Sequence, residues 1–364
     1  MRDLPGRRPL PISGPVPLAA VTLRGCKHGG RSGSCNLGQL RRVGARLTIL
    51  WLIAGAGVIA VAGILLLFGL ETHRQARDRD RYPPPGRLID VGGRRLQLLG
   101  EGEGRPTVVL VCGGGMPSVY MWPLQRRVAA FAHVVTYDRA GFGWSDPATS
   151  PLSFDDQARD LRTLLARGGE TAPFLLAGES LGGLIVRAFA TLFPEDVAGV
   201  VLIDSAEEEH VFATLDHLKA GGARQIAMAR LLGPLGLVRQ AVARSLRHAY
   251  ATADRRIIAA LLSRASFAAG VAQEVKAYDL TPEARRGPGG FGALGDIPLT
   301  VMAHGKPFPD ARIEGGWRAA QERLARLSTR GRLVVAEGIG HAIAEENPKL
   351  VAREIQLMVE EVLT

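Results

Sequence analysis

Six short runs that are apolar at nearly every position limit most strongly what this chain can fold into. A strand with one face in water alternates apolar and polar residues, whereas a parallel strand covered on both faces is apolar throughout. Helical patterns separate the runs, which suits the long crossovers of parallel strands. The runs are Val108–Cys112, Val134–Asp138, Phe174–Gly178, Val200–Asp204, Leu299–Ala303 and Leu333–Ala336. They predict an α/β fold with a mainly parallel sheet between two layers of helices.

Two shorter β patterns come before these runs. Leu88–Val91 and Arg95–Leu99 flank Gly92-Gly93, the pair of residues that a tight hairpin turn favours. With this leading hairpin the predicted sheet has eight strands. Ser153 and Asn347 stand where helices are expected to begin, and both are residues that cap helix N-termini.

A long uncharged segment lies near the N-terminus. Residues Leu47–Leu70 carry no Asp, Glu, Lys or Arg. A helix of this length crosses a hydrocarbon core of about 30 Å at about 1.5 Å per residue. A buried core helix is the alternative, but it would rarely be apolar all round for so long. The sequence therefore predicts one transmembrane helix at 47–70.

The residues around this segment predict its orientation and its surroundings. Arg41, Arg42 and Arg46 precede the span with almost no acidic residue, whereas the arginines after it are mixed with acidic ones. This bias favours a cytoplasmic N-terminus and an extracytoplasmic C-terminal domain. Residues 1–46 are expected to be a disordered basic tail, and 71–86, which ends in Pro83-Pro84-Pro85-Gly86, a stiff stalk.

The strongest chemical signal is Gly178-Glu179-Ser180-Leu181-Gly182, between a predicted strand and a predicted helix. The pattern Gly-x-Ser-x-Gly in this context is typical of a nucleophile elbow, where small residues let the strand, the turn and the helix approach closely. A serine hydroxyl needs a base to act as a nucleophile. His341, in the loop after the last predicted strand, is the expected base, and His304 is the competitor.

An oxyanion also needs hydrogen-bond donors. The N–H of Leu181, directly after the serine, is expected to be one of them. The second is assigned to Gly114 of Gly113-Gly114-Gly115, which follows the first long parallel strand, although an adjacent glycine would serve as well. Cys112 is expected to be a small buried packing residue rather than a nucleophile.

Together, Gly178–Gly182, Gly113–Gly115, Asp138–Asp146 and Gly340-His341 resemble the motifs of the α/β-hydrolase fold superfamily over about residues 86–364. The Asp138–Asp146 segment resembles a loop that is mostly structural in this family. Cys112 departs from the pattern, because relatives often carry histidine at the start of the oxyanion loop.

Family members place the triad acid after either of two strands. The first position corresponds to Asp204 and the second to the region of Asp310, which lies about two residues beyond the usual spacing from Gly305. We therefore expect Asp204 to be the acid, with Asp310 as the alternative.

The stretch between Ser205 and Asp296 is too long for an ordinary connection. It contains Ala- and Leu-rich helical patterns and resembles the helical cap of the family; a partner-binding helical module is the alternative. The patterns lie at Val211–Lys219, Ala223–Leu232, Leu237–Tyr250 and Val271–Tyr278. The expected division is a core of 87–204 and 297–364 with a cap of 205–296.

The resemblance implies a serine hydrolase that cleaves a carboxylic ester or a related acyl bond without a metal or an organic cofactor. Serine at position 180 disfavours the relatives that use an aspartate nucleophile. The substrate is expected to be a small, hydrophobic molecule; acyltransferases and perhydrolases stay open. Nucleic acid is not expected despite the net charge of +10, because the arginines are spread among apolar helices. A ligand sensor without turnover and a membrane scaffold are the non-enzymatic alternatives.

Overall fold

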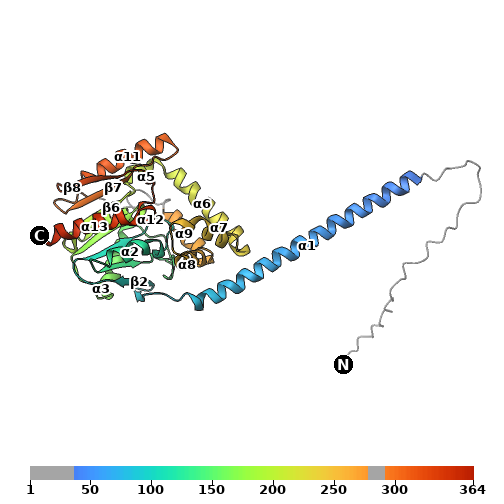
Figure 1. Cartoon of the computed structure of the whole chain (residues 1–364), viewed down its shortest axis with the longest axis horizontal. Helices are drawn as coiled ribbons and strands as arrows, with labels where there is room; N and C mark the ends of the chain where they lie inside the picture. Colours follow the sequence, from blue (N-terminus) through green and yellow to red (C-terminus); the bar gives the residue numbers. More distant parts are fainter. Residues whose placement is uncertain (1–36, 278–291) are drawn as a thin grey trace, which may run out of the picture. The chain divides into compact units, whose positions relative to one another are not determined.

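The computed structural model describes residues 37–277 and 292–364. The chain divides into two compact units, 1–59 and 60–364, and the boundary falls within the first helix. Figure 1 shows the elements that are used below.

Helix α1 extends over Leu37–Arg81 and is longer than the predicted span. It is the one helix in the described part of the chain that is long and apolar enough, by length and composition, to cross a membrane. Residues 37–46, predicted to be disordered, and 71–81, predicted to be stalk, are helical. These two predictions were wrong because no proline lies between Pro17 and Pro83, so no proline stops the helix at the ends of its apolar segment. Residues 1–36 of the predicted tail lie outside the described residues.

The sheet has eight strands in the order β1-β2-β4-β3-β5-β6-β7-β8. Neighbouring strands from β4 through β8 are parallel, while β2 runs antiparallel to both β1 and β4, so the prediction of a mainly parallel sheet with a leading hairpin is confirmed. The bounds are β1 Arg87–Asp90, β2 Arg95–Glu101, β3 Thr107–Val111, β4 Val134–Tyr137, β5 Phe174–Glu179, β6 Val197–Ile203, β7 Leu299–His304 and β8 Gly331–Ala336.

Helices cover both faces of the sheet because alternate residues of the central strands enter two different cores. In β3, Val109 and Val111 pack with one core, and Val108 and Leu110 pack with the other. The first core includes residues of α3 Phe154–Arg167, α4 Leu181–Leu192 and α11 Ala311–Ala325. The second includes residues of α2 Trp122–Val128, α12 Ile343–Glu346 and α13 Pro348–Leu363. As predicted, Ser153 and Asn347 cap α3 and α13.

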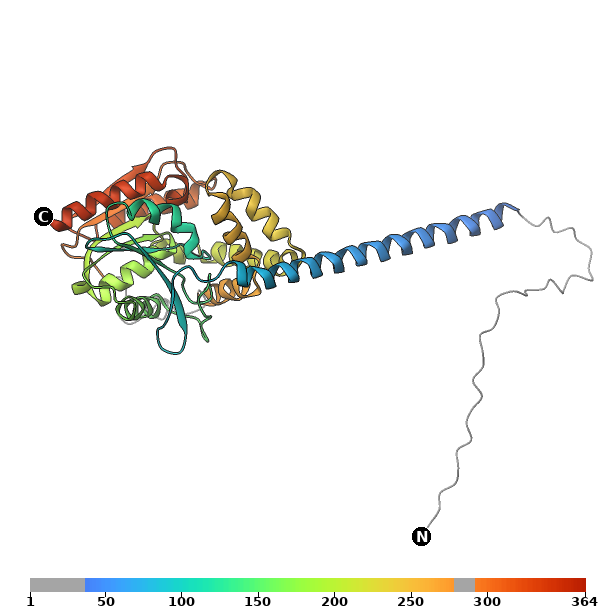
Figure 2. The ribbon, with the colours of Figure 1, turned by 60° about the horizontal axis from the view of Figure 1, so that its bottom comes forward.

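A helical insertion lies between β6 and β7, and Figures 1 and 2 show its helices grouped at one end of the α/β core. Its helices are α5 Glu208–Ala213, α6 Leu215–Leu232, α7 Leu237–Ser245, α8 Thr252–Leu262 and α9 Ala265–Ala277. The predicted helix 237–250 ends at Ser245 and continues as a 3₁₀ turn, Leu246–His248. Tyr278, the predicted end of the last pattern, lies outside the described residues, as do residues 279–291.

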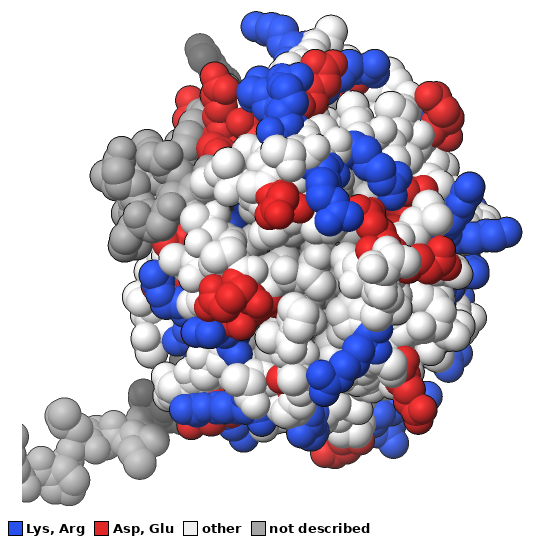
Figure 3. Space-filling view, turned by 90° about the vertical axis from the view of Figure 1, so that its left-hand side faces the viewer, with Lys and Arg blue, Asp and Glu red and all other residues white. Residues whose placement is uncertain are grey.

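The space-filling view in Figure 3 shows basic and acidic side chains intermingled over one face of the molecule. Basic and acidic side chains also form ion pairs, as between Arg330 and Glu361 and between Arg332 and Glu354. The positive net charge is therefore partly compensated by neighbouring carboxylates.

Candidate active site

The nucleophile elbow is a sharp turn between β5 and α4. Ser180 occupies it with φ +50° and ψ −119°, a backbone conformation that L-residues rarely adopt. The flanking glycines make room for the turn: a Cβ at Gly182 would lie 2.4 Å from the carbonyl oxygen of Val111, and one at Gly178 would lie 2.6 Å from that of Gly182. The elbow therefore needs both glycines for steric reasons.

Ser180, His341 and Asp204 form a hydrogen-bonded chain, although they come from three different loops. Ser180 Oγ lies 3.1 Å from His341 Nε2, and His341 Nδ1 lies 2.6 Å from Asp204 Oδ2. Since a carboxylate only accepts, Nδ1 carries the hydrogen and Nε2 presents its lone pair to the serine hydroxyl. This is the tautomer that a general base requires.

Asp204 follows the end of β6 and is fully buried. Its φ of +42° is unusual for a residue other than glycine and turns the carboxylate back toward the site. Burial alone would raise the pKa of Asp204, but hydrogen bonds from His304 and His341 outweigh it and lower the pKa. Trp317 Nε1 and the His304 backbone N–H donate to its other oxygen, both at 3.0 Å. The carboxylate is thus held in its charged form.

His304 does not contact the serine in the way expected of a competing base. Its Nδ1 lies 2.7 Å from Asp204 Oδ2, and its Nε2 lies 2.9 Å from Glu314 Oε2. The hydrogen bond to Asp204, followed by that to Glu314, raises the pKa of His304 even though burial opposes it. Both ring nitrogens therefore act as donors to carboxylates. No motif indicates this arrangement in advance; the position of His304 at the end of a strand is the one signal that points to it.

Asp310, the alternative candidate for the triad acid, caps a helix and does not bond to His341. It caps the N-terminus of α11, where its Oδ1 accepts from the backbone N–H of Arg312 at 2.9 Å. It lines the active-site cavity, but the hydrogen-bond partner of His341 is Asp204.

Asp204, His304 and His341 are also the described residues whose types and spacing would fit a metal ion, with ligand atoms within 4.8 Å of one another. Both Nδ1 atoms face the same carboxylate oxygen and must donate to it. A nitrogen that donates its hydrogen has no lone pair for a metal, so the chemistry of this cluster is that of proton positioning.

A cavity of about 540 Å³ opens beside Ser180, between the core and the helical insertion. Gly114, Gly115, Leu181 and His341 line it with Ser180, so the residues predicted for the oxyanion hole and for the base meet at one place. Its other walls are largely apolar; they include Val211, Leu218, Val271, Val275, Phe308, Ile313 and Trp317. Such a site fits a hydrophobic ligand with one polar reacting group.

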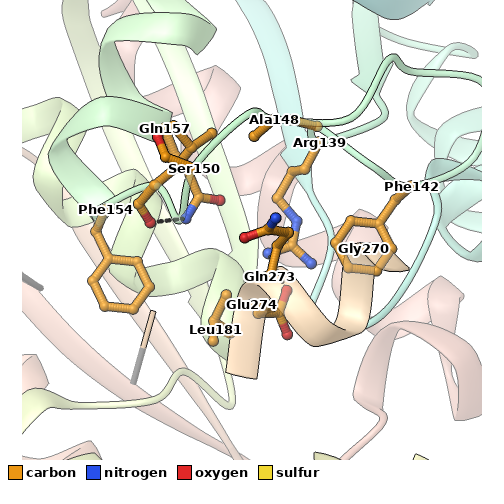
Figure 4. Close-up of a pocket in the computed structure, with 12 residues that line it drawn as sticks. Arg139, Phe142, Ala148, Ser150, Phe154, Gln157, Leu181, Gly270, Gln273 and Glu274 are labelled. Carbon is orange, nitrogen blue, oxygen red and sulfur yellow. Dashed lines mark hydrogen bonds and ion pairs between the residues drawn. The ribbon is translucent and has the colours of Figure 1, made fainter. Parts of the chain in front are cut away.

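Arg139 connects the insertion to the oxyanion loop. Its Nη2 donates to the Gly113 carbonyl at 2.7 Å, and its Nη1 lies 3.0 Å from Glu274 of α9. Figure 4 shows Arg139, Gln273 and Glu274 together in a small pocket next to Leu181. The Asp138–Asp146 segment was expected to be mostly structural, and the contacts of Arg139 and Asp138 agree with that role: Asp138 accepts from the N–H groups of Ser118 and Trp144.

Two interacting acids lie near the elbow: Glu179 is buried and Glu345 is half-buried. Burial, followed by repulsion from Glu345, raises the pKa of Glu179 to about 8. Burial likewise raises the pKa of Glu345 to about 7. Glu179 Oε1 accepts from the backbone N–H of Ala344 at 3.2 Å, so this side chain connects the elbow to the segment after His341. Cys112 is buried as predicted, and burial raises the pKa of its thiol well above its usual value.

The sheet order, the elbow after β5 and the Ser-His-Asp chain at one sheet edge define an α/β hydrolase. The model of the alpha/beta hydrolase family matches residues 108–354, and the chain belongs to this family.

Two curated relatives match shorter regions. YbdG of Bacillus subtilis, an uncharacterized protein, is 23% identical over 48% of this chain and 57% of its own length. The putative carbamate hydrolase RutD of Azorhizobium caulinodans is 35% identical over 29% of this chain and 38% of its own length. The matched region thus covers less than two thirds of each of these relatives.

Solved structures share the fold. A thermophilic esterase from Thermogutta terrifontis superposes with a TM-score of 0.55 at 22% identity, covering 76% of this chain and 97% of the esterase. A bacterial membrane phospholipase A superposes with a TM-score of 0.56 at 22% identity, covering 89% of this chain and 99% of the phospholipase.

Proposed function

We propose that this protein is a membrane-anchored serine hydrolase that cleaves a carboxylic ester or a related acyl bond through an acyl-enzyme on Ser180. The observation that carries the proposal is a chain of two hydrogen bonds at the wall of a largely apolar cavity. Ser180 Oγ lies 3.1 Å from His341 Nε2, and His341 Nδ1 lies 2.6 Å from Asp204 Oδ2. The family match, together with the esterase and the membrane phospholipase A that share the fold, supports the same class.

In the first step His341 removes the hydroxyl proton of Ser180 while Oγ attacks the acyl carbon. The N–H groups of Leu181 and Gly114 are the proposed donors to the oxyanion. The tetrahedral intermediate collapses, the ester C–O bond breaks, and His341 gives its proton to the departing alcohol. Asp204 stabilises the imidazolium that exists between these two transfers.

In the second step water attacks the acyl-enzyme, and His341 accepts one proton from it. Collapse of the second intermediate releases the acid and returns the proton to Ser180. Residues 205–296 are proposed to act as a cap over the cavity, with 87–204 and 297–364 as the catalytic core.

The test is labelling of the full chain with a fluorophosphonate, which reacts quickly only with an activated serine. We expect labelling of the wild type, none in Ser180→Ala, and slow labelling in His341→Ala. Absence of labelling in a folded wild type would refute the activity and favour a ligand sensor or a scaffold on this fold. Profiling against ester, thioester and amide libraries then identifies the acyl bond.

Anchoring by α1 is tested separately. The apolar part of α1 is proposed to span the bilayer, with the N-terminus in the cytoplasm and residues 71–364 on the opposite side. On a background in which Cys26 and Cys35 are serine, Thr72→Cys should react with a membrane-impermeant thiol reagent in intact cells, and Arg41→Cys should not. The reverse pattern would invert the topology.

A further inference from the structure

A buried ion pair joins the end of the proposed membrane span to the helical insertion. Glu71 directly follows the apolar segment of α1, yet it is only 1% exposed. Arg239 of α7 contacts it with Nη2 at 2.7 Å and Nε at 3.1 Å from Oε1. The same Nη2 lies 2.8 Å from Oδ2 of Asp78, which is also a residue of α1. Gln75, between them, donates to the Ser263 carbonyl at 2.9 Å.

The ion pair between Glu71 and Arg239 holds the bend between helices α6 and α7 next to Glu71. Helices α6 and α7 meet at a bend of 110°. Gly236 forms this bend with φ +71°, and a Cβ there would lie 2.8 Å from Glu71 Oε2. We call residues 228–239, around this bend, the insertion tip. Because Glu71 follows the last residue of the apolar segment 47–70, the bend at Gly236 lies next to the end of the span.

The insertion tip exposes large apolar side chains. Leu231 is 71% exposed, Met228 is 49% exposed and Leu237 is 41% exposed. Leu65, Leu66, Phe68 and Leu70, on the last turns of the apolar segment, are exposed too. Large apolar side chains are therefore exposed both on the end of the span and on the insertion tip. Exposed arginines accompany them at Arg74, Arg77, Arg224 and Arg230, and guanidinium groups in such a position can pair with lipid phosphates.

The helix that carries this surface also forms a wall of the active-site cavity. Leu218, Gly222 and Gln225 of α6 line the cavity, and the same helix continues to Met228 and Leu231. At about 1.5 Å per residue, the last of these lining residues is only about 9 Å along the helix from Leu231. A molecule that leaves the lipid beside Leu231 thus has a short path to Ser180.

We infer that the insertion tip rests in the surface of the lipid bilayer and that the enzyme takes its substrate, an amphipathic ester with a hydrocarbon chain, directly from that bilayer. The inference rests on the proposed function for the chemistry and on the Glu71–Arg239–Asp78 contacts for the placement. Two carboxylates around one guanidinium provide a directional contact, which suits fixing an orientation better than adding net stability.

Placement is tested without any use of catalysis. The full chain, with Cys26 and Cys35 replaced by serine, is reconstituted into vesicles of phosphatidylcholine and phosphatidylglycerol. An environment-sensitive fluorophore is attached at Leu231→Cys or, as control, at Leu357→Cys, an exposed leucine of α13, which packs against α2 and the sheet. We expect quenching by spin-labelled lipid at position 231 and none at 357. Equal quenching, or none at 231, would overturn the inference.

The ion pair is tested in the same vesicles. Arg239→Gln should weaken the quenching at position 231, because the insertion tip is then no longer held to α1. Unchanged quenching in a folded Arg239→Gln protein would overturn the role of this contact in placing the tip.

The substrate is tested with Leu231→Asp combined with Leu237→Asp, since neither residue lines the cavity. The variant loses the burial of two leucine side chains in lipid, and burial of even one contributes more free energy than a tenfold change in rate requires. Hydrolysis of a long-chain ester embedded in vesicles should therefore fall at least about tenfold. Hydrolysis of a water-soluble butyrate ester and fluorophosphonate labelling should stay within about twofold of the wild type. Equal loss on both esters, or on neither, would overturn delivery from the bilayer. Failure of the wild type on both esters and in labelling would instead refute the hydrolase proposal and leave the quenching result intact.

Discussion

His304 and His341 share one oxygen of Asp204, with their Nδ1 atoms 2.7 and 2.6 Å from Oδ2. Asp204 therefore holds two imidazoles in place. One reaches Ser180, and the other is fixed from its far side by Glu314.

Asp204→Asn should lower kcat by about 10⁴-fold, the typical loss when a serine triad loses its acid, because the amide favours the wrong imidazole tautomer. The amide also loses hydrogen bonds from buried donors, so we expect the free energy of unfolding to fall by about 1–3 kcal/mol. Steady-state kinetics well below the melting temperature separate the two effects.

Asp310→Asn is the matched control for this variant. Asparagine caps helices about as well as aspartate, so α11 should keep its N-terminus and kcat should change little. A large loss of kcat in Asp310→Asn with a mild effect in Asp204→Asn would move the acid to Asp310.

His304→Gln should make stability depend differently on pH. The pKa of His304 is raised from an ordinary value of 6.5, mainly by its hydrogen bond to Asp204. The imidazolium therefore contributes stability that is fully present below about pH 6.5 and is lost as the pH rises through the raised pKa. Thermal melts of wild type and variant should differ most near pH 6 and converge at alkaline pH. A difference that is constant over this range would contradict a charged His304.

Glu179→Gln should protect the protein against moderate alkali. The pKa of Glu179 is raised from 4.5 to about 8, mainly by burial, so the folded state favours the neutral acid. Stability from this group is full below about pH 4.5 and is lost as the pH rises toward 8 and above. Glutamine stays neutral and its amide oxygen still accepts from Ala344 N–H. We expect the melting temperature of the wild type to fall relative to that of Glu179→Gln as the pH rises from 5 to 9. Thermal denaturation followed by circular dichroism measures this difference.

Gly182→Ala should prevent normal folding of the elbow. The new Cβ would lie 2.4 and 2.6 Å from the carbonyl oxygens of Val111 and Cys112, which are backbone atoms of a central strand and its loop. Overpacking of this kind costs about 1–3 kcal/mol or more. Chemical denaturation measures the loss.

Gly315→Ala in α11 provides the control, since nothing lies within 4 Å of the added Cβ. Alanine in an open helical position is expected to stabilise by about 0.5–1 kcal/mol. Similar losses in both variants would contradict the steric explanation.

The sheet and the elbow could be predicted because their signals are local. Continuous apolar runs such as Val108–Cys112 reflect burial on both faces, and Ser180 stands between a strand and a helix that are both visible in the sequence. The placement of His341 near Ser180 could be predicted for a similar reason, because the loop that carries it follows the last strand.

The environment of Asp204 could not be predicted, because it depends on contacts between distant residues. His304 reaches it from 100 positions away and Trp317 from 113, and neither residue belongs to a recognisable motif. The contact between Arg239 and Glu71 spans 168 positions and decides which part of the insertion meets α1. The ends of α1 were mispredicted for a different reason: composition defines an apolar segment, whereas a helix continues until a residue such as proline stops it.

Arg139 makes the conformation of the glycine loop 113–115 depend on helix α9 as well as on the loop's own sequence. The same guanidinium holds the Gly113 carbonyl and the carboxylate of Glu274, so the loop is correctly placed only while α9 is seated on the core. Lifting α9 would release the loop and disable the proposed oxyanion donors at the same moment.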